Sequence, residues 1–465
     1  MRLPASFRQR LRGSARGAAM VALAATALGA AAFASGRVDA DGPGAKHVVP
    51  SPRAYGNRPT VSQLAGLGRA IFGDASLSDS GRLACATCHD PAAAFGPNAR
   101  TPSPFIDDYP EHDGTRAIPS LRYAQYAPRF TEHFIDDEDG HGTDAGPTGG
   151  LTWDGRADTA REQARLPLFA ANEMANTDDA SLARKLAAAR YALEFRRAFS
   201  APGHDVFADP KQAVEWAALA LEVYQQGREF SPFDSKYDRV LAGKATLSPA
   251  ELRGLRLYRD PAKGNCETCH PSVRLSTGAA PMFTDEGLVA IAAPRRAGLP
   301  PMAASSAAAY PLASAASGAE VDLGLCRSGR PGLSADPSFC GRFRTPTLRN
   351  VAIRPSFFHN GSLHSLRDVL LFYATRDTDP GSWYSKNPDG SVHRYDDTPP
   401  EMVEYVDHEV PFEPWPDGKP RLDGQEIDDL VAFLRTLTDA DVQAAAPDAE
   451  HVATSPAIKH TITGP

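Results

Sequence analysis

Beyond residue 34, the sequence lacks any apolar stretch long enough to span a membrane. The one candidate lies at the N-terminus, where five arginines precede an apolar run from Ala18 to Ala34. Ala32-Phe33-Ala34 fits the small-x-small rule of signal-peptide cleavage, with Ala40 as a second cleavage point. This pattern favours a removed export signal at residues 1–34 over a membrane anchor. The chain is therefore expected in the periplasm, with no membrane-bound part after cleavage.

Basic residues are also in short supply. The chain has 49 Lys and Arg against 57 Asp and Glu, a formal charge of -8. Cleavage after Ala34 would leave 44 basic residues and a charge of -13. Such a surface repels acidic partners and attracts basic ones. We therefore expect no nucleic-acid partner.

Long runs of alternating apolar and polar residues are missing as well, which argues against an extensive β-sheet. Apolar residues instead recur at helical spacing in 177–199, 210–226, 362–374 and 424–437. The 40 prolines and 38 glycines imply long loops, and two insertions are expected at 134–150 and 276–345. The predicted fold is mostly α-helical with long loops.

Cysteine is scarce, with six residues, and four of them form two similar motifs. Cys85-Ala86-Thr87-Cys88-His89 follows a short helix at 68–72, and Cys266-Glu267-Thr268-Cys269-His270 follows one at 254–258. Ser248 and Glu251 make a capping box for the second helix. This repeat predicts two cytochrome-c-like domains, at 59–245 and 246–440. A flexible lead-in at 35–58 and a loose tail at 441–465 would flank them.

The Cys-x-x-Cys-His motif has a clear chemical meaning. Two thiols add to the haem vinyl groups, and the adjacent histidine lies under the iron as its ligand. Each domain is therefore expected to carry one covalent c-type haem, held by Cys85, Cys88, Cys266 and Cys269, with His89 and His270 on the irons. A redox dithiol or half a zinc site are alternatives. The zinc alternative leaves both histidines unexplained.

The remaining two cysteines, Cys326 and Cys340, lie 14 residues apart. In an exported protein such a leftover pair most often forms a bridge, so a disulfide is expected between them.

Two haems alone would suit an electron carrier, whereas an enzyme also needs an open iron and an acid–base group. The segment Trp153-Asp154-Gly155-Arg156-Ala157, followed by Gln163, Pro167 and Glu173, resembles the bacterial dihaem cytochrome c peroxidase family, which includes the MauG-type enzymes. Further matches are Pro119-Ser120-Leu121, residues 345–350 and His359-Asn360-Gly361.

The resemblance implies roles for four residues. Trp153 would relay electrons between the haems. Gln163 and Pro167 would line the distal pocket of the first haem, and Glu173 would be the acid–base group that promotes O–O cleavage. The N-terminal domain would then be peroxidatic and the C-terminal domain would transfer electrons. A tryptophan that only packs a core and a glutamate that only caps a helix are the alternatives.

Tyr373 lies fourteen residues after His359, where the peroxidases have a methionine ligand to the second haem and the MauG-type enzymes a tyrosine. The resemblance thus implies that Tyr373 ligates the second iron. A phenolate ligand stabilises ferric iron and lowers the potential. A buried aromatic residue on the inner face of a helix is the alternative.

The sequence also departs from the family. Ala117 replaces an asparagine that helps to bind calcium, and Arg354-Pro355-Ser356 replaces a Thr-x-Pro segment that donates carbonyls. Calcium is therefore doubtful. The long gap before Trp153 contains His112, His133 and His141, each a candidate resting ligand of the first iron or an exposed loop residue.

These features predict an oxidoreductase that reduces hydrogen peroxide with electrons from a small periplasmic cytochrome or cupredoxin. The acidic run 136–139 is a candidate docking site for a basic donor, although such runs are more often solvated loops. One alternative is a MauG-like enzyme that uses peroxide and a high-valent dihaem state to oxidise a residue on a partner protein. The other is a non-catalytic electron carrier, which would leave Glu173 and Gln163 without a task.

Overall fold

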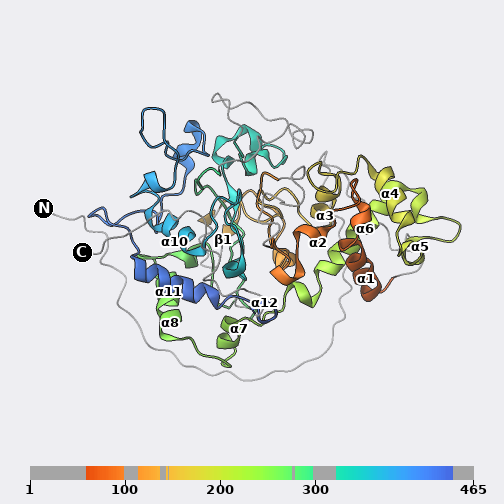
Figure 1. Cartoon of the computed structure of the whole chain (residues 1–465), viewed down its shortest axis with the longest axis horizontal. Helices are drawn as coiled ribbons and strands as arrows, with labels where there is room; N and C mark the ends of the chain where they lie inside the picture. Colours follow the sequence, from red (N-terminus) through yellow and green to blue (C-terminus); the bar gives the residue numbers. More distant parts are fainter. Residues whose placement is uncertain are drawn as a thin grey trace, which may run out of the picture. The chain divides into compact units, whose positions relative to one another are not determined.

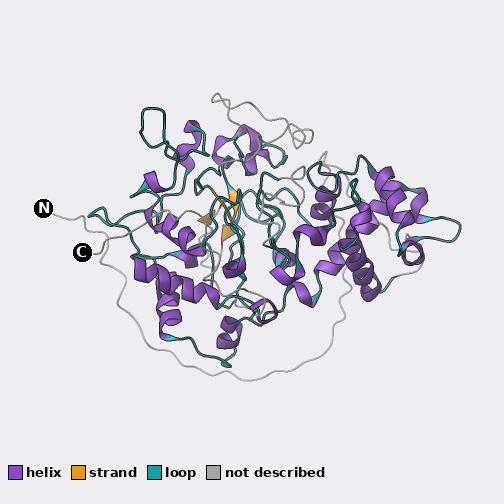
Figure 2. Cartoon of the chain, viewed as in Figure 1, coloured by secondary structure: helices purple, strands orange, loops and turns teal. Residues whose placement is uncertain are grey.

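A computed structural model of the chain describes residues 59–98, 114–136, 143–144, 146–274, 278–296 and 321–443. The expected export signal, the lead-in, His112 and His141 lie outside the described residues. Contacts separate residues 1–50 from residues 51–465, and the latter form one unit. The described part is rich in helices, with long loops and few strands (Figure 2).

The elements follow one another along the chain as labelled in Figure 1. The described helices are α1 (Val61–Phe72), α2 (Cys85–Cys88), α3 (Ala160–Phe169), α4 (Asp179–Ala188), α5 (Ala192–Phe199), α6 (Pro210–Gln225), α7 (Lys236–Leu241), α8 (Pro249–Arg259), α10 (Leu366–Thr375), α11 (Gly424–Arg435) and α12 (Ala440–Gln443). The described strands are β1 (Ile135–Asp136), β2 (Thr143–Asp144), β3 (Leu288–Val289) and β4 (Phe343–Arg344), and they pair antiparallel as β1–β2 and β3–β4. Within the described ranges, every helix is too short or too polar to cross a membrane.

The helix before the first motif crosses a second helix at very close range. α1 packs against α6, and the two meet at Gly68. A Cβ at this position would lie 2.0 Å from the backbone oxygen of Ala220, so no larger residue fits. The crossing lies in a hydrophobic core, which we call the first core. Its buried members run from Leu67 to Phe230.

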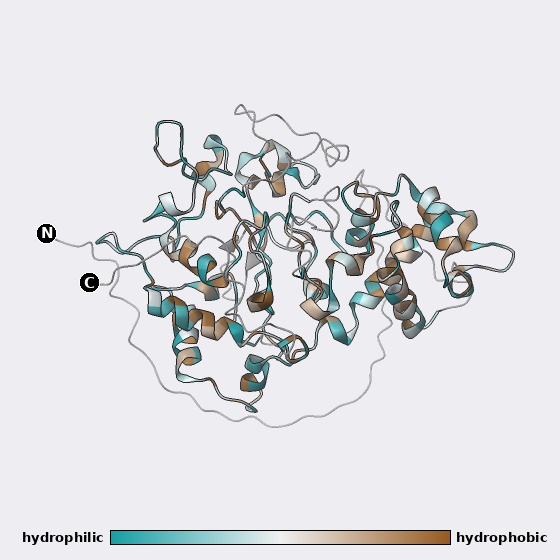
Figure 3. Ribbon diagram, in the orientation of Figure 1, coloured by the Kyte–Doolittle hydropathy of each residue, from teal (hydrophilic) through white to brown (hydrophobic). Residues whose placement is uncertain are grey.

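The helix before the second motif repeats this arrangement. α8 packs against α11, and a Cβ on Gly254 would lie 2.0 Å from the backbone oxygen of Asp429. The surrounding second core runs from Tyr237 to Leu437. In Figure 3 α11 alternates between brown and teal, because one of its faces is apolar and packs into this core. Tyr237 of α7 also packs here, although α7 precedes the predicted domain boundary at 245/246.

Several predicted helices have the expected bounds. The helices predicted at 210–226 and 424–437 are confirmed by α6 and α11, and the Ser248–Glu251 capping box is present. The helical spacing seen at 177–199 corresponds to two helices, since α4 ends at Ala188 and α5 begins at Ala192. The break lets α4 pack against α6 while α5 packs against α1.

The predicted start of the loose tail falls inside α12. Asp441 of this helix pairs with Arg122, whose guanidinium is buried and also bonds Asp439 at 2.8 Å. A buried cation requires such anionic partners. The residues after 443 lie outside the described part.

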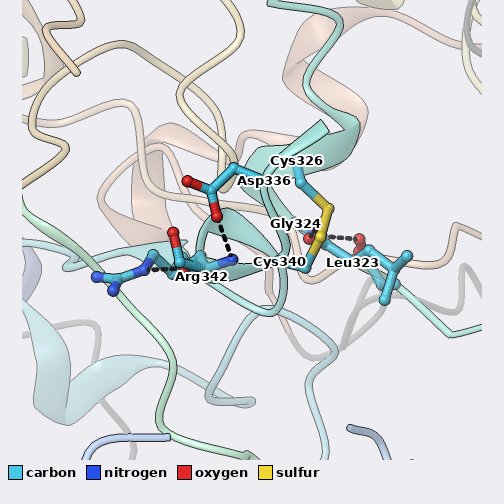
Figure 4. The surroundings of a disulfide bond; sticks show 8 residues. Leu323, Gly324, Cys326, Asp336, Cys340 and Arg342 are labelled. Carbon is cyan, nitrogen blue, oxygen red and sulfur yellow. Dashed lines mark hydrogen bonds between the residues drawn. A yellow bond between two sulfur atoms is a disulfide. The ribbon is translucent and has the colours of Figure 1, made fainter. Parts of the chain in front are cut away.

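The second predicted insertion is more ordered than its composition suggests. Among its described residues, a third core gathers Leu288 with buried residues between 323 and 340. Cys326 and Cys340 are joined by a disulfide in this core, with Cα atoms 4.8 Å apart (Figure 4). We refer to residues 321–344 as the disulfide segment.

Candidate active site

The first motif forms the single turn α2, and its histidine lies at the C-terminal end of that turn. His89 Nδ1 lies 3.1 Å from the Phe95 carbonyl oxygen. Burial lowers the pKa of His89 to about 4, although the carbonyls of Phe95 and Pro119 act in the opposite direction. The imidazole is therefore neutral at physiological pH, which is the form that ligates a metal.

The second motif has the same design. His270 follows a 3₁₀ turn at Cys266–Thr268, and its Nδ1 lies 2.8 Å from the Phe283 carbonyl oxygen. Burial lowers its pKa to about 4, against the effect of that carbonyl. A histidine that donates through Nδ1 to a carbonyl presents Nε2 to a metal in a fixed orientation.

The four motif cysteines have chemistry that suits haem attachment better than zinc. Burial raises the pKa of each thiol to about 12. Zinc binds thiolates, which burial disfavours here, whereas a thioether to haem carries no charge. The thiols and imidazoles of the two motifs thus fit two c-type haems.

A cavity of about 260 Å³ is lined both by the second motif and by residues between Ala93 and Trp153. Its lining includes Cys266, Cys269 and His270 as well as Trp153 and Tyr373. The lining is mainly apolar, as a haem requires. The structure therefore brings Tyr373 and Trp153 to the same cavity as the second motif.

Tyr373 projects from α10 and stacks on Phe412, with ring centroids 4.9 Å apart. Among the described residues, its hydroxyl has no hydrogen-bond partner. Burial is the largest of the effects that raise its pKa, and nearby Cys269 and Cys266 add to it. The phenol is neutral in the protein alone, so a bound iron would have to supply the charge that stabilises a phenolate.

Trp153 is held from both sides. Its indole Nε1 donates a hydrogen bond of 2.7 Å to the Ala117 carbonyl, and its own carbonyl accepts one of 2.7 Å from the Arg344 N–H. The Ala117 N–H in turn donates to the His359 carbonyl at 2.6 Å. Trp153 is only 9% exposed, and its position is fixed by parts of the chain that are distant in sequence.

The residues predicted for the first distal pocket lie on α3 and the turn after it. Pro167 lies within α3, where its missing N–H leaves the Gln163 carbonyl without its helical partner. The following turn places Glu173, with its N–H donating to the Ala170 carbonyl at 3.0 Å. Buried Asn176 fixes this turn by donating to the carbonyls of Leu77 and Leu168.

The carboxyl of Glu173 has a raised pKa. Desolvation raises its pKa to about 7, while the charge of Arg156 acts in the opposite direction. The side chain is accessible to solvent, and its charge adds to the effects that raise the pKa of the half-buried thiols Cys85 and Cys88. This coupling means that the solvent-accessible carboxyl lies near the first motif, on the side of the turn that follows α3.

Two further cavity residues were not assigned a role from the sequence. His359 stacks on Phe343 with ring centroids 3.5 Å apart, and its buried Nε2 has no hydrogen-bond partner within the described ranges. Arg354 lines the cavity and donates to the Ile118 carbonyl at 3.1 Å. Burial lowers the pKa of Arg354 to about 10, so it stays charged. The Arg354 cation in the lining of this cavity suits a ligand with carboxylates, such as haem, whereas His359 Nε2 lies 4.0 Å from Asp397 Oδ2. The His-Asn-Gly match was the only sequence signal for His359.

Of the loop histidines, only His133 is described. Its side chain is 64% exposed, and its Nε2 lies 3.7 Å from Glu132 Oε1.

Comparison with known proteins agrees with this geometry. Residues 62–246 match the family described as di-haem cytochrome c peroxidase. The methylamine utilization protein MauG of Paracoccus denitrificans is 35% identical over 390 residues, which cover 82% of this chain and 90% of that protein. The cytochrome c551 peroxidase of Pseudomonas aeruginosa is 26% identical over 318 residues, 67% of this chain and 72% of that protein.

A solved structure is similar over nearly the same length. The diheme peroxidase BthA of Burkholderia thailandensis is 38% identical, with a TM-score of 0.71, and the match covers 84% of this chain and 89% of that one. The resemblance seen in the sequence is thereby confirmed. The chain belongs to the di-haem cytochrome c peroxidase family, which includes MauG, and is an oxidoreductase of the peroxidase class.

Proposed function

We propose that the chain reduces hydrogen peroxide at the haem held by Cys85, Cys88 and His89, with electrons that arrive through a haem at the second motif. Glu173 carries this proposal, because its charge acts on the Cys88 thiol of the first motif and desolvation raises the pKa of its carboxyl to about 7. A carboxyl that titrates near neutral pH can take a proton from peroxide and return it. An electron carrier needs no such group.

Each part of the site then has a task. A haem held by Cys85, Cys88 and His89 would supply the redox-active iron for this reaction. Glu173 moves a proton from one peroxide oxygen to the other, so that the O–O bond breaks and water leaves. Two electrons and two protons enter for each peroxide, and two waters are formed. Gln163 orients the peroxide by hydrogen bonding, Pro167 shapes the pocket wall, and Trp153 couples the two sites.

The electrons would come from a small basic cytochrome or cupredoxin in the periplasm. The expected N-terminal signal and the charge of -13 after its removal support this location and this partner. The donor would meet the second domain, where Tyr373 and His270 are the proposed iron ligands.

The proposal predicts a simple stoichiometry. One equivalent of peroxide added without oxygen to the fully reduced protein should oxidise both haems, because each peroxide takes two electrons. Optical spectra of both haems measure the result. Cys85→Ala/Cys88→Ala, which lacks the first attachment site, should keep its remaining haem reduced. A wild-type protein whose haems stay reduced in excess peroxide would be a carrier instead.

Tyr373 favours a second candidate. A MauG-like enzyme would use peroxide to oxidise a residue on a partner protein, and it would draw electrons from that partner. Tyr373 lies in the cavity beside Cys266 and Cys269, where a phenolate ligand would hold the second iron ferric. Consumption of peroxide without any added donor, together with oxidation of a co-purifying protein, would favour this candidate.

A further inference from the structure

The segment around Trp153 forms hydrogen bonds and ion pairs with residues that are distant in the sequence. Arg344 donates from its backbone to the Trp153 carbonyl and from Nε to the Thr152 carbonyl at 3.2 Å. Arg116 bridges Asp154 to Asp322, at 2.8 and 2.6 Å. Both Asp322 and Arg344 belong to the disulfide segment.

A third set of contacts to this segment comes from Arg330, which lies in the loop that the disulfide closes. Arg330 donates to the Gly155 carbonyl from Nε at 3.0 Å and from Nη2 at 2.6 Å. Its Nη2 also pairs with Asp158 at 2.6 Å, and the guanidinium lies 4.1 Å from the Phe130 ring centroid. Its side chain is only 18% exposed, so these charged contacts are largely shielded from water.

The turn after Trp153 is stabilised from within by the Leu151–Ala157 backbone pair and by the Arg156–Asp154 ion pair, and Arg330 adds a contact from outside. Gly155 has φ +65°, and a Cβ there would lie 2.9 Å from the Gly149 carbonyl oxygen. A glycine brings no side chain to stabilise the turn and the greatest freedom to lose. The turn between Trp153 and Asp158 is therefore held chiefly through its backbone and its carboxylates.

We propose that the disulfide segment is the positioning element for Trp153, and that Arg330 is the positioning residue through which the Cys326–Cys340 disulfide acts. The Cys326–Cys340 disulfide (Figure 4) closes the loop 326–340 and restricts its freedom. This restriction keeps the Arg330 guanidinium on the Gly155 carbonyl. The link to electron transfer rests on the proposed role of Trp153, whereas the positioning itself does not.

The test compares Arg330→Gln with the wild-type holoprotein. Backbone hydrogen exchange in 151–158 should become about tenfold faster, because a charge-assisted contact to the turn is lost. Electron transfer between the haems after pulsed reduction should become about tenfold to a hundredfold slower, because the relay is misplaced. Arg330→Lys should partly rescue both, and Cys326→Ser/Cys340→Ser should change both in the same direction but less.

Arg196→Gln is the matched control. Like Arg330, Arg196 pairs with a carboxylate, Asp205 at 3.0 Å, and lies over a ring, 4.7 Å from the Phe207 centroid, but it belongs to α5 and not to the disulfide segment. It should leave both measurements at wild-type values. Unchanged exchange in Arg330→Gln would overturn the proposal. Trp153→Phe separates the two questions: if it transfers electrons as fast as the wild type, the relay role fails, while the exchange result still decides the positioning.

Discussion

Glu173→Gln is expected to slow the reaction with peroxide by roughly 10²–10⁴-fold, the range for loss of an acid–base group. The amide keeps the size of the side chain but cannot accept the peroxide proton. Both haems should remain attached, because no motif residue changes. Stopped-flow mixing with peroxide measures the rate constant.

The pH dependence gives an independent check on the same residue. The carboxyl must be ionised to accept a proton, and desolvation raises its pKa to about 7. The wild-type rate should therefore rise as the pH increases through about 7 and level off above it, while the variant should lack this step. Glu194→Gln, on the exposed face of α5, is the control and should behave like the wild type. A Glu173→Gln variant as fast as the wild type would move the acid–base role to another residue.

Tyr373→Met is expected to raise the reduction potential of the second haem by on the order of 100 mV, since axial ligands set haem potentials over about 0.8 V. With tyrosine, the diferric protein should react rapidly with peroxide without prior reduction. With methionine, that reactivity should be lost and reduction of the second haem should become necessary. Spectroelectrochemistry and stopped-flow spectra measure the two effects.

Two further variants separate ligation from packing. Tyr373→Phe keeps the ring that stacks on Phe412 but removes the hydroxyl, so it should change the second haem's spectrum as well. Tyr384→Phe removes the hydroxyl of another buried tyrosine of the second core, which donates to the Ala292 carbonyl, and should leave the haem unchanged. If Tyr373→Met has the wild-type potential and spectrum, Tyr373 is only a packed core residue.

Local sequence patterns predicted the haem motifs, one helix start and two long helices, because each of these depends on residues close together in the chain. The two motifs follow from covalent chemistry within five residues, and the start of α8 follows from Ser248 and Glu251 three residues apart. Periodicity found α6 and α11. It missed the break between α4 and α5, because apolar spacing continues across it while tertiary packing turns α5 toward α1.

The convergence of side chains could not be predicted in the same way. The contacts that fix Trp153 involve Ala117 and Arg344, which are up to 191 residues away, and no local pattern encodes such contacts. The disulfide segment has the composition of a loop, yet a small core and the Cys326–Cys340 bond order it. The roles of Glu173 and Gln163 were inferred from the resemblance to the peroxidase family. The desolvation of the Glu173 carboxyl is seen only in the structure.

The most direct test of the account is a count of covalent haems by intact mass. The account predicts two haems in the wild-type protein, one in Cys85→Ala/Cys88→Ala and one in Cys266→Ala/Cys269→Ala. Each variant should keep the optical spectrum of the haem at its intact motif. A wild-type protein that carries one covalent haem, or none, would contradict it.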